Sequence, residues 1–234
     1  MYVCDIYVWT YTYASNTSFI DFYVNHIRTH VYIPNFYVCI LMYVHNWSKY
    51  KNFYTSVFYL NIDKVNEYDI LNINFKADIG CIISNEFFDA LPFNRFIKEE
   101  GEVKKLFIEL RENELLEIKK ELKNFDFFDK EIISKIPDGS KFEIIENIDL
   151  ICAKLSSFFN NCIMVTVDYG FNKYDNLFFK NPNGLVRCYS NHSMNKNILE
   201  NIGNKDITCD VNFNLLNDCL SKHGLIKIGN TSQE

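Results

Sequence analysis

Two carboxylates directly after an apolar run near residue 80 are the side chains of this chain best placed for chemistry. The run 79–83 is followed, after Ser84, by Asn85, Glu86 and Asp89. A continuous apolar run of this length predicts a buried strand, and ligands of open α/β sheets gather at the carboxyl ends of strands. A pair of carboxylates there can bind a guanidinium or accept a proton. The alternative is a pair of solvated acids in a helical turn capped by Asn85, favoured by the helix dipole.

A second acid stands at the end of a second apolar run. Residues 162–167 predict another buried strand, which ends in Asp168, Tyr169 and Gly170. An acid followed by an aromatic residue at a strand end can line a cofactor site. A simple strand-ending turn remains the alternative reading.

Three further polar residues are candidates in the last third of the chain. His192 follows Arg187 and Tyr189 in a polar loop, where a general base or a surface histidine would fit. Asp206 stands in a second loop and is either a site residue or a solvated acid. Asp210 precedes an apolar-periodic segment, so it is predicted to cap the helix that follows.

The elements around these residues predict an α/β fold. Strands are expected at 57–60, 79–84, 162–167, 185–189 and 225–228, and a hairpin over 95–97 and 104–110 through a turn at Glu100 and Gly101. Amphipathic helices are expected at 112–123, 143–159 and 213–221. A helix followed by a buried strand that ends in an acid is the repeating unit of such a fold.

Composition limits the classes of partner. The net charge is −6 and basic residues do not cluster, which argues against nucleic acid. The eight cysteines form no metal-ligand spacing, so no metal is expected and they read as small buried residues in a reducing compartment. The longest apolar run of the first 60 residues, 31–44, contains Pro34 and is shorter than the roughly 20 residues of a spanning helix.

The first 60 residues differ from the rest in composition. They hold most of the tyrosines and only five charged side chains: Asp5, Asp21, Arg28, Lys49 and Lys51. Neither a secretory signal nor a mitochondrial presequence fits this segment. We therefore expect 1–60 to be a tyrosine-rich leader, disordered or not native coding sequence, and 61–234 to be a partial enzyme domain.

Four segments occur in an order that resembles one family. They are Asn85-Glu86-Phe87-Phe88-Asp89-Ala90-Leu91-Pro92, then Val167-Asp168-Tyr169-Gly170, then Arg187-Cys188-Tyr189-Ser190-Asn191-His192, and finally Asp206-Ile207-Thr208-Cys209-Asp210-Val211-Asn212-Phe213. Over residues 75–234 the chain resembles the MidA family, the mitochondrial complex I assembly methyltransferases and their bacterial relatives. The family pattern has an acid where this chain has Asn212.

The resemblance implies a class I, Rossmann-like methyltransferase that uses S-adenosylmethionine for symmetric dimethylation of an arginine on a core complex I subunit. It implies a mitochondrial location in a eukaryote and a cytoplasmic one otherwise. Glu86, Asp89 and Asp168 would be catalytic. Asn85, Phe87 and Tyr169 would bind the cofactor, and His192 and Asp206 the protein substrate.

One part of the family pattern is absent from the sequence. None of the eight glycines forms a GxGxxG or P-loop motif. The expected sheet is therefore incomplete, without the N-terminal cofactor-binding half and the C-terminal closing elements. A non-catalytic remnant that serves as an assembly or binding module is the alternative function, and the oligomeric state stays open.

Overall fold

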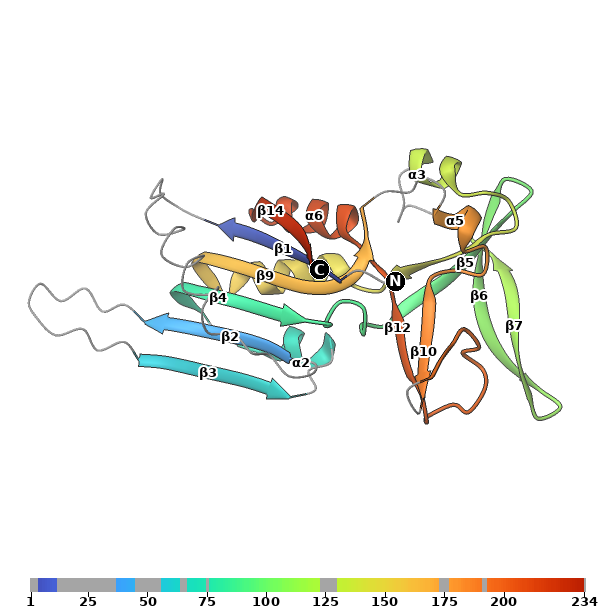
Figure 1. Cartoon of the computed structure of the whole chain (residues 1–234), viewed down its shortest axis with the longest axis horizontal. Helices are drawn as coiled ribbons and strands as arrows, with labels where there is room; N and C mark the ends of the chain where they lie inside the picture. Colours follow the sequence, from blue (N-terminus) through green and yellow to red (C-terminus); the bar gives the residue numbers. More distant parts are fainter. Residues whose placement is uncertain are drawn as a thin grey trace, which may run out of the picture. The chain divides into compact units, whose positions relative to one another are not determined.

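The computed structural model describes residues 4–11, 37–44, 56–63, 67–74, 76–122, 130–172, 177–190 and 193–233. It divides into two compact units. The first comprises Met1–Phe88, Asn147–Gly170 and Phe213–Glu234, and the second Asp89–Glu146 and Phe171–Asn212. Each unit is described in turn, and Figure 1 labels their elements.

A mixed β-sheet forms the first unit. Its strands lie in the order β14 (Ile226–Gln233), β1 (Cys4–Tyr11), β9 (Phe159–Phe171), β4 (Ala77–Asn85), β2 (Tyr37–Val44) and β3 (Ser56–Asp63). Strands β4 and β9 run parallel, whereas β1 pairs antiparallel with β9 and β14, and β2 with β3 and β4. The expected α/β class is confirmed, as an α/β fold with a mixed sheet.

Strands β1, β2 and most of β3 fall within residues 1–60, where the sequence predicts a leader. The predicted division of the chain at residue 60 stays a prediction.

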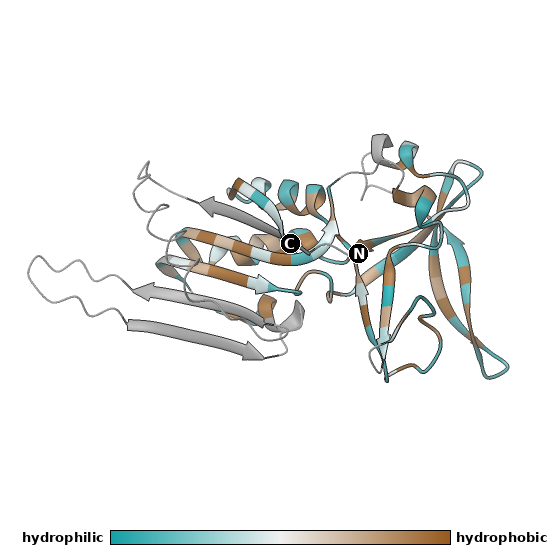
Figure 2. Ribbon diagram, in the orientation of Figure 1, coloured by the Kyte–Doolittle hydropathy of each residue, from teal (hydrophilic) through white to brown (hydrophobic). Residues whose placement is uncertain are grey.

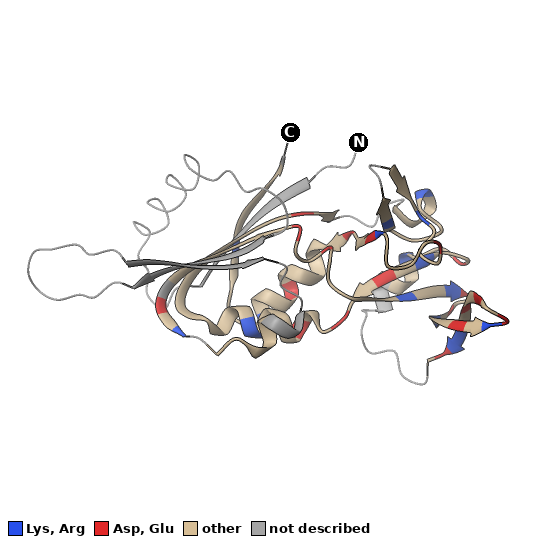
Figure 3. Ribbon diagram, turned by 90° about the horizontal axis from the view of Figure 1, so that it is seen from below, with Lys and Arg blue, Asp and Glu red and all other residues tan. Residues whose placement is uncertain are grey.

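Among the described residues of this unit, three helices accompany the sheet: α2 (Glu67–Asn72), α4 (Ile148–Ser157) and α6 (Phe213–Lys222). Helix α4 buries Ile148, Ile151 and Leu155, which recur at helical spacing and so form one apolar face. Helix α4 contacts both α2 and α6. Figure 3 shows helices gathered on one side of the sheet. Figure 2 shows β4 and β9 largely in hydrophobic colours, as expected for strands at the centre of a covered sheet.

Gly80 explains how the parallel pair packs so closely. A Cβ at Gly80 would lie 2.0 Å from a ring carbon of Phe159, whose side chain is 2% exposed. The missing side chain therefore leaves room for the Phe159 ring at the start of β9.

The second unit contains two antiparallel sheets. One has four strands in the order β7 (Glu114–Glu121), β6 (Glu102–Arg111), β5 (Phe93–Glu99) and β8 (Lys141–Ile145). The other has the order β11 (Ser193–Asn195), β10 (Val186–Ser190) and β12 (Asp206–Cys209). The unit also holds α3 (Lys130–Lys135), α5 (Leu177–Lys180) and the short β13 (Val211–Asn212).

Aromatic rings form the core of the second unit. Phe96 and Phe142 stack with ring centroids 5.4 Å apart, and Phe178 meets Phe142 edge-on at 6.3 Å. Ile136 and Leu185 complete this buried cluster. It joins β5 and β8 to the α3 and α5 region.

The expected helix over 112–123 is wrong. Strand β7 occupies most of that segment and pairs antiparallel with β6, so that Leu115 lies opposite Leu110. Glu112 and Asn113 both have positive φ, 48° and 68°, which is the backbone of a tight two-residue hairpin turn. The turn returns the chain along β6, and the apolar residues of the segment serve a strand instead of a helix face.

The expected helix over 143–159 is correct only in its later part. Residues Lys141–Ile145 form β8, in which Phe142 lies opposite Phe96 of β5. Asn147 then adopts a left-handed conformation with φ 53°, and α4 begins after it. The predicted β5–β6 hairpin, the strands near 79–84 and 162–167, and the helix ending before Gly224 are confirmed.

Candidate functional site

The carboxyl end of β4 lies beside the later part of β9 in the first unit. Their parallel register places Asn85 opposite Val167 and Ser84 opposite Thr166. The hydroxyl oxygens of Ser84 and Thr166 are 2.9 Å apart and both side chains are buried. Glu86 directly follows β4, whereas Asp168 lies inside β9, which continues to Phe171 and does not end at 167 as predicted. Glu86 thus stands at the carboxyl end of a parallel strand, where α/β sheets bind ligands.

Asp168 uses its carboxylate to hold the backbone of this edge. The side chain is fully buried, and its Oδ2 accepts a hydrogen bond from the Phe88 amide at 2.9 Å. Its Oδ1 accepts one from the Tyr169 amide at 3.0 Å. A buried carboxylate with such donors compensates its own desolvation, so Asp168 fixes the segment that follows β4.

Glu86 sits on that fixed segment in a strained conformation. Its φ is 46°, a left-handed value that costs a non-glycine residue about 1 kcal/mol. Its amide donates to the Val167 carbonyl at 2.8 Å, and the Asp168 bond to Phe88 follows two residues later. The surrounding bonds therefore impose the conformation, and strain held in this way is typical of functional positions.

The three residues predicted to bind a cofactor differ in exposure. Asn85 and Tyr169 are half-buried, whereas Phe87 is buried, with its ring edge-on to that of Phe88 at 5.0 Å. Tyr169 is therefore the more accessible of the two aromatic residues.

Asp89 belongs to the second unit and is buried beside β12. Its backbone carbonyl accepts a hydrogen bond from the Cys209 amide at 2.8 Å, and its side chain is 2% exposed. The negative charge of Asp89 acts on Arg187, which is also 2% exposed. The structure thus places Asp89 close to a buried arginine of its own chain.

Arg187 is the functional candidate that residue spacing missed. Its guanidinium forms an ion pair with Asp210 and donates to the Tyr189 hydroxyl at 3.3 Å. Burial alone would lower the Arg187 pKa, but Asp210, Tyr189 and Asp89 together raise it. A charged residue inside the apolar run 185–188 was the available signal, because such a residue is rarely buried without a partner.

Asp210 does not cap the helix as predicted. Burial raises the Asp210 pKa, and the nearby Arg187 charge opposes that rise. Helix α6 begins at Phe213, after β13, so the Asp210 carboxylate serves the ion pair and not the helix start.

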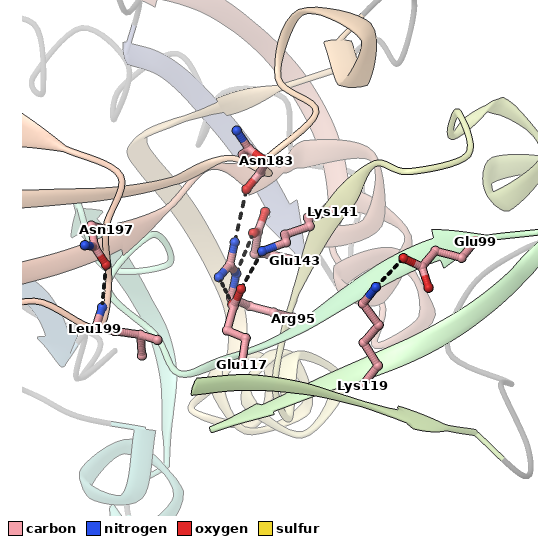
Figure 4. Close-up of polar contacts among 9 residues, drawn as sticks. All are labelled: Arg95, Glu99, Glu117, Lys119, Lys141, Glu143, Asn183, Asn197 and Leu199. Atoms are coloured by element: carbon pink, nitrogen blue, oxygen red, sulfur yellow. Dashed lines mark hydrogen bonds and ion pairs between the residues drawn. The ribbon is translucent and has the colours of Figure 1, made fainter. Parts of the chain in front are cut away.

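A second buried ion-pair network lies on the four-stranded sheet (Figure 4). Arg95 donates to Glu143 at 3.1 Å and to the Asn183 carbonyl at 3.0 Å, and it also pairs with Glu117. Lys141 pairs with the same Glu117. Burial raises the Glu143 pKa, with the Leu185 amide and Arg95 acting against it.

The predicted substrate residues have different outcomes. Asp206 is exposed at the start of β12, opposite Tyr189 of β10. His192 lies outside the described residues. The roles assigned to all eight candidate residues stay predictions.

The described residues contain neither a cluster of metal ligands nor a helix able to span a membrane. No three His, Cys, Asp or Glu side chains among them are grouped so that they could hold a metal ion. Across the same part of the chain, every helix is too short or too polar to span a membrane. The structure describes the side chains of six of the eight cysteines, and all six are buried and outside any disulfide, as the sequence predicts.

The comparisons with known structures show what this fold resembles. A crystal structure of a Burkholderia thailandensis protein bound to S-adenosyl-homocysteine matches with TM-score 0.57 and 15% identity over 65% of this chain and 39% of that one. A native crystal structure of an uncharacterized protein from the same organism matches with TM-score 0.55 and 15% identity, over 65% of this chain and 41% of that one. The chain therefore spans about two fifths of their length. At this identity the likeness is one of fold.

A family model matches the sequence itself. It is described as "Putative S-adenosyl-L-methionine-dependent methyltransferase" and covers residues 48–231. A search of curated proteins gave no match. Because the family model extends over most of the chain, the protein belongs to this family of S-adenosyl-L-methionine-dependent methyltransferases.

Proposed function

We propose that the protein is an arginine methyltransferase of the MidA type. It would dimethylate a protein arginine symmetrically and act in the assembly of respiratory complex I, in the mitochondrion if the source is eukaryotic and in the cytoplasm otherwise. The observation that carries the proposal is Glu86, a half-buried acid held in a strained conformation at the β4 edge. The order of the four sequence segments around it supports the specific family.

The residues at this edge fit one part of an S-adenosylmethionine site. Asn85 and Glu86 offer oxygen acceptors for hydroxyl and amino groups, and Tyr169 offers a half-buried ring. A glycine-rich turn is not found in the 234 residues. The proposal therefore includes a Rossmann-like class I sheet whose cofactor-binding half lies outside this sequence.

The chemistry assigned to the chain is the handling of a guanidinium. When bound, S-adenosylmethionine supplies an electrophilic methyl group. An arginine guanidinium is protonated at neutral pH, so a carboxylate must orient it and accept the proton that the methylated nitrogen loses. Glu86 is proposed to do both, because it projects from a segment whose backbone is bound on both sides.

The other two predicted catalytic acids take different places in this proposal. Asp168 acts as a positioning residue, since its two oxygens accept the Phe88 and Tyr169 amides. Asp89 faces Arg187 within the second unit, and its predicted catalytic role rests on the family resemblance alone.

A methyl-transfer assay tests the function. A full-length protein that includes the cofactor-binding half proposed to lie outside these 234 residues is incubated with labelled S-adenosylmethionine and an isolated core complex I subunit. Mass spectrometry then identifies the modified side chain. Glu86→Gln is expected to reduce kcat by about 10²- to 10⁴-fold, as for loss of a general base. Glu200→Gln, an exposed acid of a surface loop, is the matched control and should keep wild-type turnover.

Two results would contradict the proposal at different levels. Unchanged turnover of Glu86→Gln would remove Glu86 from the chemistry. A methyl group on a side chain other than arginine would leave the family activity in place and overturn the substrate.

A non-catalytic binding module is the second candidate, favoured by the missing glycine-rich turn. It predicts that calorimetry of the purified chain with S-adenosylmethionine shows no heat of binding. Micromolar binding would exclude it.

A further inference from the structure

The β6–β7 hairpin exposes an unusual amount of apolar surface for one small element. Phe107, Ile108, Leu110 and Leu116 are exposed by 37%, 48%, 65% and 41% of their surface. Figure 2 shows hydrophobic colours along both strands of this hairpin. The register puts Phe107 and Leu116 on one face of the hairpin and Ile108 and Leu110 on the other. Single exposed apolar residues are ordinary, but apolar residues exposed on both faces of one outer hairpin indicate an interaction surface.

Strand β7 is the outer strand of its sheet in the part of the chain that the structure describes. An outer strand presents backbone donors and acceptors that can pair with another strand. In an antiparallel hairpin, successive residues direct these groups alternately toward and away from the partner strand. Counted from the turn-flanking pair Arg111 and Glu114, the groups of Leu115, Glu117 and Lys119 point away from β6.

This alternation restricts how a second β7 could pair with the first. The outward residues 115, 117 and 119 must lie opposite one another, so the sum of paired residue numbers is even. One such antiparallel register sets Glu117 opposite itself. It then places Leu116 opposite Ile118 and Glu114 opposite Lys120, each twice because of the two-fold symmetry.

The side chains of this register are self-complementary. Glu114, Leu116, Ile118 and Lys120 lie on one face of β7, together with Phe107 of β6, which is opposite Ile118. Each copy would offer an acid to the other's lysine and an apolar residue to the other's apolar residue. Lys120 already lies 4.6 Å above the Phe107 ring, so its charge stands on this same face.

The one like-charge pair in the register is already neutralised. Glu117 lies opposite its own copy, but within each chain it pairs with Arg95 and Lys141 (Figure 4). We propose that a second copy of this chain is the partner of the hairpin, joined by antiparallel pairing of the two β7 strands into one continuous sheet. This inference does not depend on the proposed methyl transfer.

Charge reversal tests the pairing. Analytical ultracentrifugation of the wild-type protein over a range of concentrations should show a monomer–dimer equilibrium. Glu114→Lys and Lys120→Glu should each weaken the dimer by about tenfold or more, because each places like charges opposite one another twice. The double variant Glu114→Lys with Lys120→Glu restores both pairs with reversed sign and should restore the dimer.

The controls keep folding separate from pairing. Both charged residues are exposed, so far-ultraviolet circular dichroism and thermal unfolding of the single variants should match the wild type. Glu102→Lys, on the same sheet but outside β7, should leave the dimer intact. A wild-type protein that stays monomeric at all concentrations would overturn the inference, as would a dimer that the double variant does not restore.

Discussion

At the scale of single residues, Glu86 directly after β4 and Asp168 inside the neighbouring β9 have different surroundings. Asp168 is fully buried and bonded to two amides, whereas Glu86 is half-buried and strained. The Asp168 carboxylate accepts hydrogen bonds from two backbone amides and so holds the local backbone in place. Strain of the kind held at Glu86 is typical of functional positions.

Removing one oxygen of Asp168 tests its structural role. Asp168→Asn replaces one acceptor by a donor that faces a backbone amide, so about 1–3 kcal/mol of unfolding free energy should be lost. Urea denaturation followed by circular dichroism measures it. The exposed Asp206→Asn should change stability by less than about 0.5 kcal/mol. Equal effects of the two substitutions would contradict the assigned role.

The strain at Glu86 predicts a stability gain on its removal. Glu86→Gly should raise the free energy of unfolding by about 1 kcal/mol, since glycine adopts positive φ without steric cost. Glu102→Gly is the matched control. This exposed glutamate has an ordinary strand conformation, and the substitution should lower stability by about 0.5–1 kcal/mol. The strain interpretation fails if both variants are destabilised alike.

At the scale of elements, the β6–β7 hairpin shows how a turn decides between two readings of one segment. The leucines and isoleucine of residues 115–118 suit a helix face and also a strand with two partly exposed faces. The positive φ of Glu112 and Asn113 selects the hairpin, because a helix cannot pass through two left-handed residues.

Improving this turn should stabilise the hairpin. Changing Glu112 to Asn and Asn113 to Gly creates the sequence that two-residue turns with positive φ prefer, and it should add about 1 kcal/mol to the unfolding free energy. Thermal and urea unfolding measure the gain. Glu112→Val, a β-branched residue at positive φ, should lower stability instead. A gain with valine would show that this turn is not formed in solution.

At the scale of the whole molecule, one buried acid and one partly exposed acid make stability depend on pH in opposite ways. Burial raises the Glu143 pKa above its ordinary 4.5 in the second unit. In the first unit, Lys222 and His223 beside Asp149, on helices α6 and α4, lower the Asp149 pKa from 3.8. Glu143 therefore contributes stability at low pH and loses it as pH rises, whereas Asp149 contributes at higher pH and loses it as pH falls.

The sign for Glu143 can be measured by comparing variants. With a raised folded-state pKa, its contribution is fully present below the unfolded pKa and is lost as pH rises through the folded value. The difference in unfolding free energy between wild type and Glu143→Gln should thus fall as pH rises from about 4 to about 8. Asp149→Asn should give the opposite slope, and only below about pH 4, because the Asp149 contribution is present above the unfolded value and is lost as pH falls through the lowered folded value. A flat difference for Glu143→Gln would contradict the raised pKa.

The amino-acid sequence by itself determined the central strands. Continuous apolar runs at 79–83 and 162–167 leave few conformations other than buried strands. The end of the second strand was not set by its apolar run, because β9 continues through Asp168 to Phe171. The buried cysteines and the β5–β6 hairpin follow from equally local signals.

Only the tertiary structure decided what each charged residue does. Asp168 meets the Phe88 amide across 80 positions of sequence, and Arg187 meets Asp210 across 23. A local pattern reports whether a side chain tends to be buried. It does not report which partner compensates a buried charge, because that partner arrives through folding. The acids that looked alike in sequence therefore divide into one that holds the strand ends, two that face a buried arginine, and Glu86, on which the proposed chemistry rests.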